Sequence, residues 1–227
     1  MIRVTENLPK IRDLLSLAAA EAGRDPADVR LLAVSKKQAL SDVLAAAALG
    51  QRDFGENTVQ EGVEKIRAAA RADLTWHFIG HLQSNKTRAV AENFDWVHTI
   101  DKSRTAQRLS RQRPAELPPL NICLQVNVDS EAGKSGVSAD ALLELAGTCS
   151  ELPRLRLRGL MCLPRIRADF DDQRRPFRQL CELAGLLREN GIDTGELSMG
   201  MSGDYRAAIF EGATIVRIGT ALFGERS

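Results

Sequence analysis

Two hydrophobic patterns alternate along the whole chain. Short runs rich in aliphatic residues predict strands, and stretches with apolar residues three and four positions apart predict helices. The strand-type segments number eight, at residues 30–35, 52–55, 75–79, 95–99, 121–128, 156–160, 196–198 and 214–217. Helical patterns between them include residues 41–49, 59–70, 86–92, 139–149 and 176–190, the last followed by Gly191 as a helix stop. A further amphipathic segment runs from Leu8 to Leu17 and stops at Gly23, which predicts a helix ahead of the first strand.

This order of elements predicts the fold class. Alternating strands and helices are typical of α/β proteins with a parallel sheet. Eight such units in 227 residues fit a (β/α)8 barrel of the TIM type. We therefore expect a single barrel domain over residues 1–227, with the extra N-terminal helix. An open, doubly wound sheet is the alternative, because periodicity counts the strands without showing whether the sheet closes.

Composition narrows the classes of function. Apolar residues make up 44% of the chain and charged residues 27%, which is enough for a sizeable core and is not typical of disorder. The net charge of +1 provides no global field that would attract nucleic acid or an anionic membrane. No apolar run approaches the ~20 residues that span a bilayer, and the N-terminus lacks the apolar core of a signal peptide. We therefore expect a cytoplasmic protein.

The spacing of cysteines and histidines argues against two further kinds of site. The four cysteines lie far apart and form no CxxC pair, which predicts reduced thiols in a cytosolic protein. His77 and His81 are four residues apart, but no other metal-type residue stands at zinc-site spacing around them. We therefore expect no metal site.

The residues that follow the strands carry the chemistry, because the site of a (β/α)8 barrel lies at the C-terminal ends of its strands. Lys36 follows the first strand. A lysine amine in such a place can lose its proton and form a Schiff base with a carbonyl cofactor. Side chains alternate along a strand, so only one of Lys36 and Lys37 can point inward. Spacing alone does not say which.

Two glycine-rich loops follow the seventh and eighth strands, at residues 198–203 and 219–224. Such loops expose backbone N–H groups to an anion, and this pair of positions is the usual phosphate site of a barrel. The first and eighth strands are neighbours when a barrel closes, so the amine of Lys36 and the phosphate site come close together. A phosphate-bearing aldehyde held by a lysine indicates pyridoxal 5′-phosphate (PLP).

Longer segments resemble the PLP homeostasis protein family, also called the proline synthetase co-transcribed homologues. The barrel of this family is similar to the N-terminal domain of alanine racemase. The resemblance covers nearly the whole chain. The matching segments are AVSK (33–36), FGENTVQE (54–61), WHFIGHLQSNK (76–86), GKSG (133–136), RGLM (158–161), LSMGMS (197–202) and VRIGTALFG (216–224).

The resemblance implies a role for each motif residue. Lys36, rather than Lys37, is similar to the Schiff-base lysine of the family. Arg217 resembles the arginine that faces the pyridine nitrogen. A guanidinium does not give up its proton, so it disfavours a protonated pyridinium and makes the ring a poorer electron sink. The other implied cofactor contacts are Asn57 and His77 on the ring side, and Ser198, Met199, Ser202, Gly219 and Thr220 in the phosphate cradle.

Two functions remain: a binding protein that holds and supplies PLP and supports amino-acid balance, and an amino-acid racemase or related enzyme. A two-base racemase needs an acid/base group on each face of the α-carbon, and in the related racemase architecture a tyrosine from an additional β domain supplies the second. The chain ends at Ser227 and has one tyrosine, Tyr205. We therefore favour the binding protein, without dedicated catalytic activity and as a monomer.

The favoured function implies small-molecule ligands and transient protein partners. PLP and other B6 vitamers are the implied ligands, and apo forms of PLP enzymes are the partners that supply would require. Lys86 and Lys134 are interpreted first as solvated charges. The alternative for each is a second amine that accepts the aldehyde during cofactor release.

Overall fold

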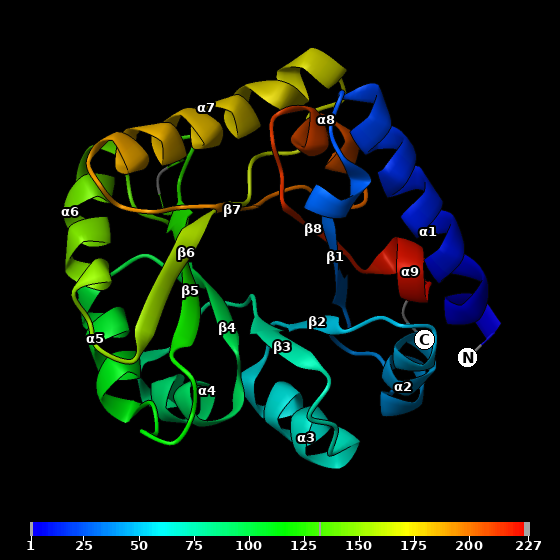
Figure 1. Cartoon of the computed structure of the whole chain (residues 1–227), viewed down its shortest axis with the longest axis horizontal. Helices are drawn as coiled ribbons and strands as arrows, with labels where there is room; N and C mark the ends of the chain where they lie inside the picture. Colours follow the sequence, from blue (N-terminus) through cyan, green and yellow to red (C-terminus); the bar gives the residue numbers. More distant parts are fainter. Residues whose placement is uncertain (1, 132, 225–227) are drawn as a thin grey trace.

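The strands close into a barrel. The computed structural model describes residues 2–131 and 133–224. Eight parallel strands pair in sequence order, and β8 pairs with β1, with Ala33 in register with Ile218. The barrel prediction is therefore confirmed, and the open-sheet alternative is wrong (Figure 1).

The element boundaries follow the predicted pattern to within two residues for every strand. The strands are β1 (Arg30–Val34), β2 (Asp53–Glu56), β3 (Thr75–Phe78), β4 (Trp96–Ile100), β5 (Leu120–Val126), β6 (Leu155–Cys162), β7 (Glu196–Ser198) and β8 (Ile215–Ile218). The α-helices are α1 (Ile2–Glu21), α2 (Leu40–Ala48), α3 (Val59–Ala69), α4 (Thr87–Asn93), α5 (Ser103–Gln112), α6 (Ala139–Ser150), α7 (Phe170–Glu189), α8 (Tyr205–Phe210) and α9 (Thr220–Phe223). Two short 3₁₀ helices are η1 (Pro26–Asp28) and η2 (Ser84–Lys86).

Helix α1 is the extra N-terminal helix that the sequence predicts, and it packs outside the barrel against α8, α9 and α2 (Figure 1). It ends in a Schellman motif: the Arg24 N–H donates to the Ala19 carbonyl, and Gly23 adopts a φ of +70°. Its apolar stripe differs in part from the expected one. Leu8 is fully buried, whereas Leu17 is 57% exposed, because a turn of 100° per residue places it on the flank of the helix.

Helix α7 begins six residues earlier than the pattern predicts. The expected start was Pro176, because proline favours the first turn of a helix. The observed cap is Asp169, whose carboxylate accepts the N–H of Asp172. Pro176 therefore lies inside the helix and is buried. The predicted end is confirmed, since the Ile192 N–H donates to the Leu187 carbonyl across Gly191.

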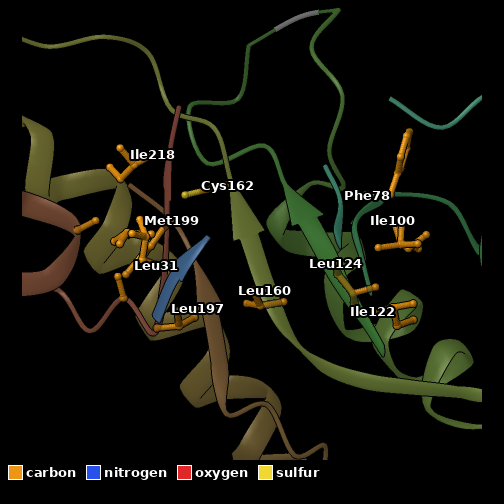
Figure 2. Packing of buried hydrophobic residues seen from close by; sticks show 14 of the residues in the cluster. Leu31, Phe78, Ile100, Ile122, Leu124, Leu160, Cys162, Leu197, Met199 and Ile218 are labelled. Atoms are coloured by element: carbon orange, nitrogen blue, oxygen red, sulfur yellow. The ribbon is translucent and has the colours of Figure 1, made fainter. Parts of the chain in front are cut away.

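The main hydrophobic core lies between the strands and the surrounding helices (Figure 2). Phe54, Phe78 and Leu124 belong to it and are completely buried. Each of these residues alternates along its strand with a neighbour on the opposite face, as the period of two requires. The apolar face of each strand therefore points outward to the helices, and its other face points into the barrel.

The barrel interior is polar. A small apolar group of Trp96, Cys123 and Met161 is separate from the main core. The His98 ring on β4 and the Ser198 hydroxyl on β7 are 2.7 Å apart, although these strands are not neighbours. Side chains of such strands can meet only across the inside of the barrel. The interior thus holds a hydrogen-bonded set of side chains where a barrel commonly packs branched aliphatic residues.

No helix within residues 2–131 and 133–224 has both the length and the apolar character needed to cross a membrane. No group of three or more potential metal ligands occurs within the same residues.

Candidate functional site

A cavity of about 520 Å³ opens at the C-terminal ends of the strands, within the usual size range of small-molecule sites. Six of the nine residues predicted to contact a cofactor line it: Lys36, Asn57, Ser202, Arg217, Gly219 and Thr220. Sequence reasoning did not name the other lining residues as contacts, although Gly80 was noted at a strand end. They are Val34, Gln38, Ile79, Gly80, Leu163, Met201 and Gly203.

Lys36 lies two residues beyond the end of β1 and is half-buried, whereas Lys37 is exposed. A turn follows the strand, closed by the Gln38 N–H donating to the Ser35 carbonyl at 3.0 Å. Within it Lys37 adopts a left-handed φ of 59°. Lys36 lines the cavity and Lys37 does not. The structure therefore places the first of the two amines at the site.

A buried charged group behind β1 holds the Lys36 turn. The Lys65 ammonium on α3 donates to the Ser35 carbonyl at 2.6 Å and to one oxygen each of Glu56 and Glu61 at 2.8 Å. Glu56 also accepts the Ser35 hydroxyl, and Glu61 accepts the Lys37 N–H. We call Glu56, Glu61 and Lys65 the Lys65 cluster. It fixes the residues on both sides of Lys36.

Burying the charged groups of the Lys65 cluster costs desolvation free energy, which their mutual pairing must offset. The Glu56 side chain is fully buried and Lys65 is 9% exposed. Burial raises the pKa of Glu56 above its ordinary value, although the hydrogen bonds from Lys65 and Ser35 oppose that shift. The Oε2 atom of Glu56 has no hydrogen-bond partner within the described residues. The buried carboxylate therefore depends on Lys65.

The loops after β7 and β8 line the cavity with residues whose backbone amides have no acceptor within the described residues. The Met201 N–H is occupied, because it donates to the Asp204 carboxylate at 2.6 Å. Gly219 packs against the end of β1: a Cβ built on it would lie 3.3 Å from the Val34 carbonyl oxygen. In the described ranges no acceptor faces the amides of Ser202, Gly203, Gly219 and Thr220. Such amides favour an anion.

Asn57 and Gly80 form a close backbone approach on the other side of the cavity. A Cβ built on Gly80 would lie only 2.0 Å from the Asn57 carbonyl oxygen. No side chain fits that gap, so glycine is required there by contact and not by its φ angle. The approach lets the chain after β3 pass over the chain after β2, where both line the cavity.

Arg217 places a buried guanidinium in the cavity wall. It is 4% exposed and reaches from β8 to the barrel interior. Its Nη1 donates to the Ser198 hydroxyl at 2.8 Å, and its Nη2 donates to the Cys162 carbonyl at 2.9 Å. Burial lowers the pKa of Arg217, but a guanidinium stays protonated at neutral pH. The cavity wall therefore carries a fixed positive charge.

The three remaining predicted contacts do not line this cavity. His77 and Ser198 belong to the strands themselves, and their side chains are hydrogen-bonded in the barrel interior below Arg217. Met199 is fully buried in the outer core, and its N–H donates to the Ile215 carbonyl. Position relative to a strand end does not decide the matter, because Val34 and Arg217 line the cavity from within β1 and β8. His77 and Ser198 are held by their hydrogen bonds in the interior, and Met199 by its packing in the outer core. His98 lies inside β4 and joins the same interior hydrogen bonds.

A second hollow adjoins the cavity. It shares Ile79, Leu163 and Met201 with the main cavity and is also lined by His81 and Lys134. The Lys134 ammonium forms an ion pair with Glu131. Lys86, by contrast, is exposed in η2 and lines neither hollow. The described structure thus brings one of the two candidate release lysines near the cavity.

Comparison with known proteins agrees with this geometry. The family model of the alanine racemase N-terminal domain matches residues 7–227. The PLP homeostasis protein of Pseudomonas aeruginosa is 56% identical over 227 residues, covering 100% of this chain and 97% of the relative. The Escherichia coli K12 protein of the same name is 53% identical over 228 residues, covering 98% and 97%. The chain belongs to the PLP homeostasis protein family.

Two solved structures share the fold of this chain. PipY of Synechococcus elongatus with PLP bound has a TM-score of 0.85 and 36% identity, covering 97% of this chain and 100% of PipY. An alanine racemase of Clostridium difficile has a TM-score of 0.77 at 15% identity, and the match covers 99% of this chain but 57% of the racemase. The second likeness concerns the fold alone.

Proposed function

We propose that this protein binds PLP in the mouth cavity, holds it as a Schiff base on Lys36, and serves PLP homeostasis. One observation carries the proposal: Lys36 lines the same cavity as four loop residues whose backbone N–H groups donate no hydrogen bond within the described residues. The amine suits an aldehyde, and the amides suit a phosphate dianion. The residues present therefore fit the cofactor that the PipY structure contains.

Each residue of the cavity has a distinct part in this proposal. Lys36 supplies the amine, and the Lys65 cluster holds its backbone. Gly219 and Ser202 would contribute amides from adjacent loops to the phosphate, and Arg217 would contribute its charge to the ring side. When bound, PLP supplies an electron sink whose strength depends on protonation of the ring nitrogen. The fixed charge of Arg217 would disfavour protonation of that nitrogen and so weaken the sink.

We infer holding and supply of the cofactor rather than amino-acid turnover. The curated relatives are named as homeostasis proteins. The single tyrosine of the chain, Tyr205, packs against the outer core and is not among the cavity-lining residues. It therefore does not supply a second acid/base group at the cavity. Contact with apo enzymes, a cytoplasmic location and a monomeric state stay predictions from the sequence.

Borohydride reduction tests the proposal, because it converts a Schiff base to a stable amine. Purified protein loaded with PLP is reduced, digested and analysed by mass spectrometry. We expect a phosphopyridoxyl label on Lys36, unchanged in Lys37→Ala and lost in Lys36→Ala. Lys37→Ala is the matched control, since it removes the adjacent exposed amine. A label on Lys37, or no label at all, contradicts the proposal.

A further inference from the structure

Five side chains form one continuous chain of hydrogen bonds through the barrel interior. It starts at Arg217, whose Nη1 is 2.8 Å from the Ser198 hydroxyl. Ser198 Oγ is 2.7 Å from His98 Nδ1, and His98 Nε2 is 2.9 Å from His77 Nδ1. His77 Nε2 is 2.9 Å from Asp53 Oδ1. We call these five residues the cross-barrel chain.

For two neutral imidazoles, the ends of the cross-barrel chain fix the direction of every hydrogen bond in it. A guanidinium can only donate, and a carboxylate can only accept. The Ser198 hydroxyl therefore accepts a hydrogen bond from Arg217 and donates one to His98 Nδ1. Each imidazole then accepts at Nδ1 and donates at Nε2, the last of them to Asp53. Both histidines are neutral and carry their proton on Nε2.

The electrostatics of the interior agree with this direction. Burial lowers the pKa of His98 well below its ordinary value, and the charges of Arg217 and Arg30 add to the shift. Burial also lowers the pKa of His77, against the opposing effect of Asp53. Burial raises the pKa of Asp53, but its hydrogen bond to His77 and nearby positive charge outweigh that and lower it overall. The opposite direction would need a protonated Asp53.

We propose that Asp53, His77, His98 and Ser198 are positioning residues that hold the Arg217 guanidinium in the cavity wall and connect it to a carboxylate at the other end of the barrel. The Ser198 oxygen and the Cys162 carbonyl hold two guanidinium nitrogens at fixed points. Arg217 cannot turn away without leaving a buried acceptor unpaired, which is costly.

The cross-barrel chain ends at Asp53, which is partly exposed at the surface. The Asp53 side chain is 21% exposed and lines a separate hollow of about 390 Å³, together with Arg12 and Gln51. This hollow lies at the N-terminal ends of β1 and β2, opposite the cofactor cavity. The cross-barrel chain thus connects the Arg217 guanidinium in the cavity wall to a carboxylate that is partly exposed at the opposite end of the barrel.

Histidine tautomers test the directed chain without any cofactor. Long-range ¹H–¹⁵N correlation of ¹⁵N-histidine-labelled protein distinguishes Nε2–H, Nδ1–H and doubly protonated rings. We expect two neutral Nε2–H rings at pH 7, belonging to His77 and His98. The exposed His81 provides the third signal, which His81→Asn removes. An Nδ1–H tautomer or an imidazolium at His77 or His98 at pH 7 overturns the proposal.

The connection to the cavity is tested with PLP bound, and this part rests on the proposed function. Asp53→Asn removes the distant negative charge while keeping an oxygen acceptor. The pH midpoint of the visible absorbance of the Lys36-linked cofactor should fall by on the order of half a pH unit, as one charge acting across a barrel interior would produce. Asp73→Asn, an exposed carboxylate near the same end, should leave the midpoint in place. Equal midpoints for wild type and Asp53→Asn refute the coupling.

The two proposals fail in different ways. Loss of the borohydride label from Lys36 in the wild type contradicts PLP binding, whereas the tautomer measurement still decides the cross-barrel chain. A normal label with an unchanged midpoint in Asp53→Asn contradicts only the chain. If Asp53→Asn does not fold, the wild-type tautomers remain a complete test of the hydrogen-bond direction.

Discussion

Replacing Lys65 by methionine should destabilise the protein and loosen the Lys36 turn. Methionine keeps the length of the side chain and removes the ammonium that three acceptors share. The loss of the ammonium affects these acceptors unequally, because they differ in their access to water. Glu61 is 26% exposed and can turn to water, whereas the Glu56 carboxylate is fully buried. The dominant effect is therefore an uncompensated buried charge on Glu56.

The size of the effect follows from that charge. Removing one partner of a buried ion pair costs about 3–5 kcal/mol. Since domains unfold with about 5–15 kcal/mol, Lys65→Met should remove roughly a fifth or more of the free energy of unfolding. Urea unfolding followed by tryptophan fluorescence measures this, with Trp76 and Trp96 as buried reporters. A lower midpoint with an unchanged slope is the expected result.

The pH dependence identifies Glu56 as the cause. The pKa of this buried carboxyl is already raised in the folded protein, and without Lys65 it rises further. A group whose pKa is higher folded than unfolded adds stability below its unfolded pKa and loses it as pH rises through the folded pKa. The difference between Lys65→Met and wild type should therefore shrink as the pH falls from 7 toward the ordinary range of a carboxyl.

A surface pair provides the control. Arg175 is 76% exposed and pairs with Asp172 within α7. Arg175→Met removes the same kind of charge from water and should cost less than about 1 kcal/mol. If Lys65→Met costs no more than this control at pH 7, or costs the same at pH 5, the buried-charge reasoning is refuted.

Two further predictions concern packing and thiol reactivity. Gly80→Ala forces a Cβ against the Asn57 carbonyl, so it should lower the free energy of unfolding by about 1–3 kcal/mol and weaken PLP binding. Gly203→Ala is the control and should fold normally, because nothing lies within 4 Å of its added Cβ. Equal melting temperatures for the two variants would count against the clash. At pH 8 native protein should take up one iodoacetamide equivalent, on the partly exposed Cys181, and alkylation of several thiols would argue against the burial described. The protected thiols, whose pKa burial raises to about 12, are Cys123, Cys149 and Cys162.

Sequence periodicity predicted the barrel well because each strand carries its apolar face outward to a helix. That single face gives a clear pattern, and a glycine after α1 or α7 gives a clear stop. The start of α7 was missed because Pro176 is a stronger start signal than Asp169, although the acidic first turn at Asp171 and Asp172 was present. Tertiary packing tolerates a buried proline that local preference disfavours.

Sequence motifs predicted Lys36, Arg217 and Gly219 as contacts, and all three line the cavity, but the motifs did not separate the cavity from the barrel interior below it. Lys36 and Gly219 follow their strands and reach the cavity. His77 lies within β3 and is hydrogen-bonded in the interior instead. Nothing in the local sequence around Lys65 marks it as a support for Lys36, because the contact spans two elements. Such supports need three-dimensional neighbours to be recognised.

The polar interior and the Lys65 cluster both hold cavity-lining residues in place without a ligand. An open cavity can exchange its ligand, but its walls cannot rely on the ligand to stay in place. Lys36 and Arg217 carry the chemistry of the cavity, and each is held from outside it. The Lys65 cluster clamps the turn around Lys36 from the helix side, and the cross-barrel chain holds Arg217 from the interior. A site that is fixed by its supports keeps the same geometry before binding and after release, which suits a protein that must both take up and give away its cofactor.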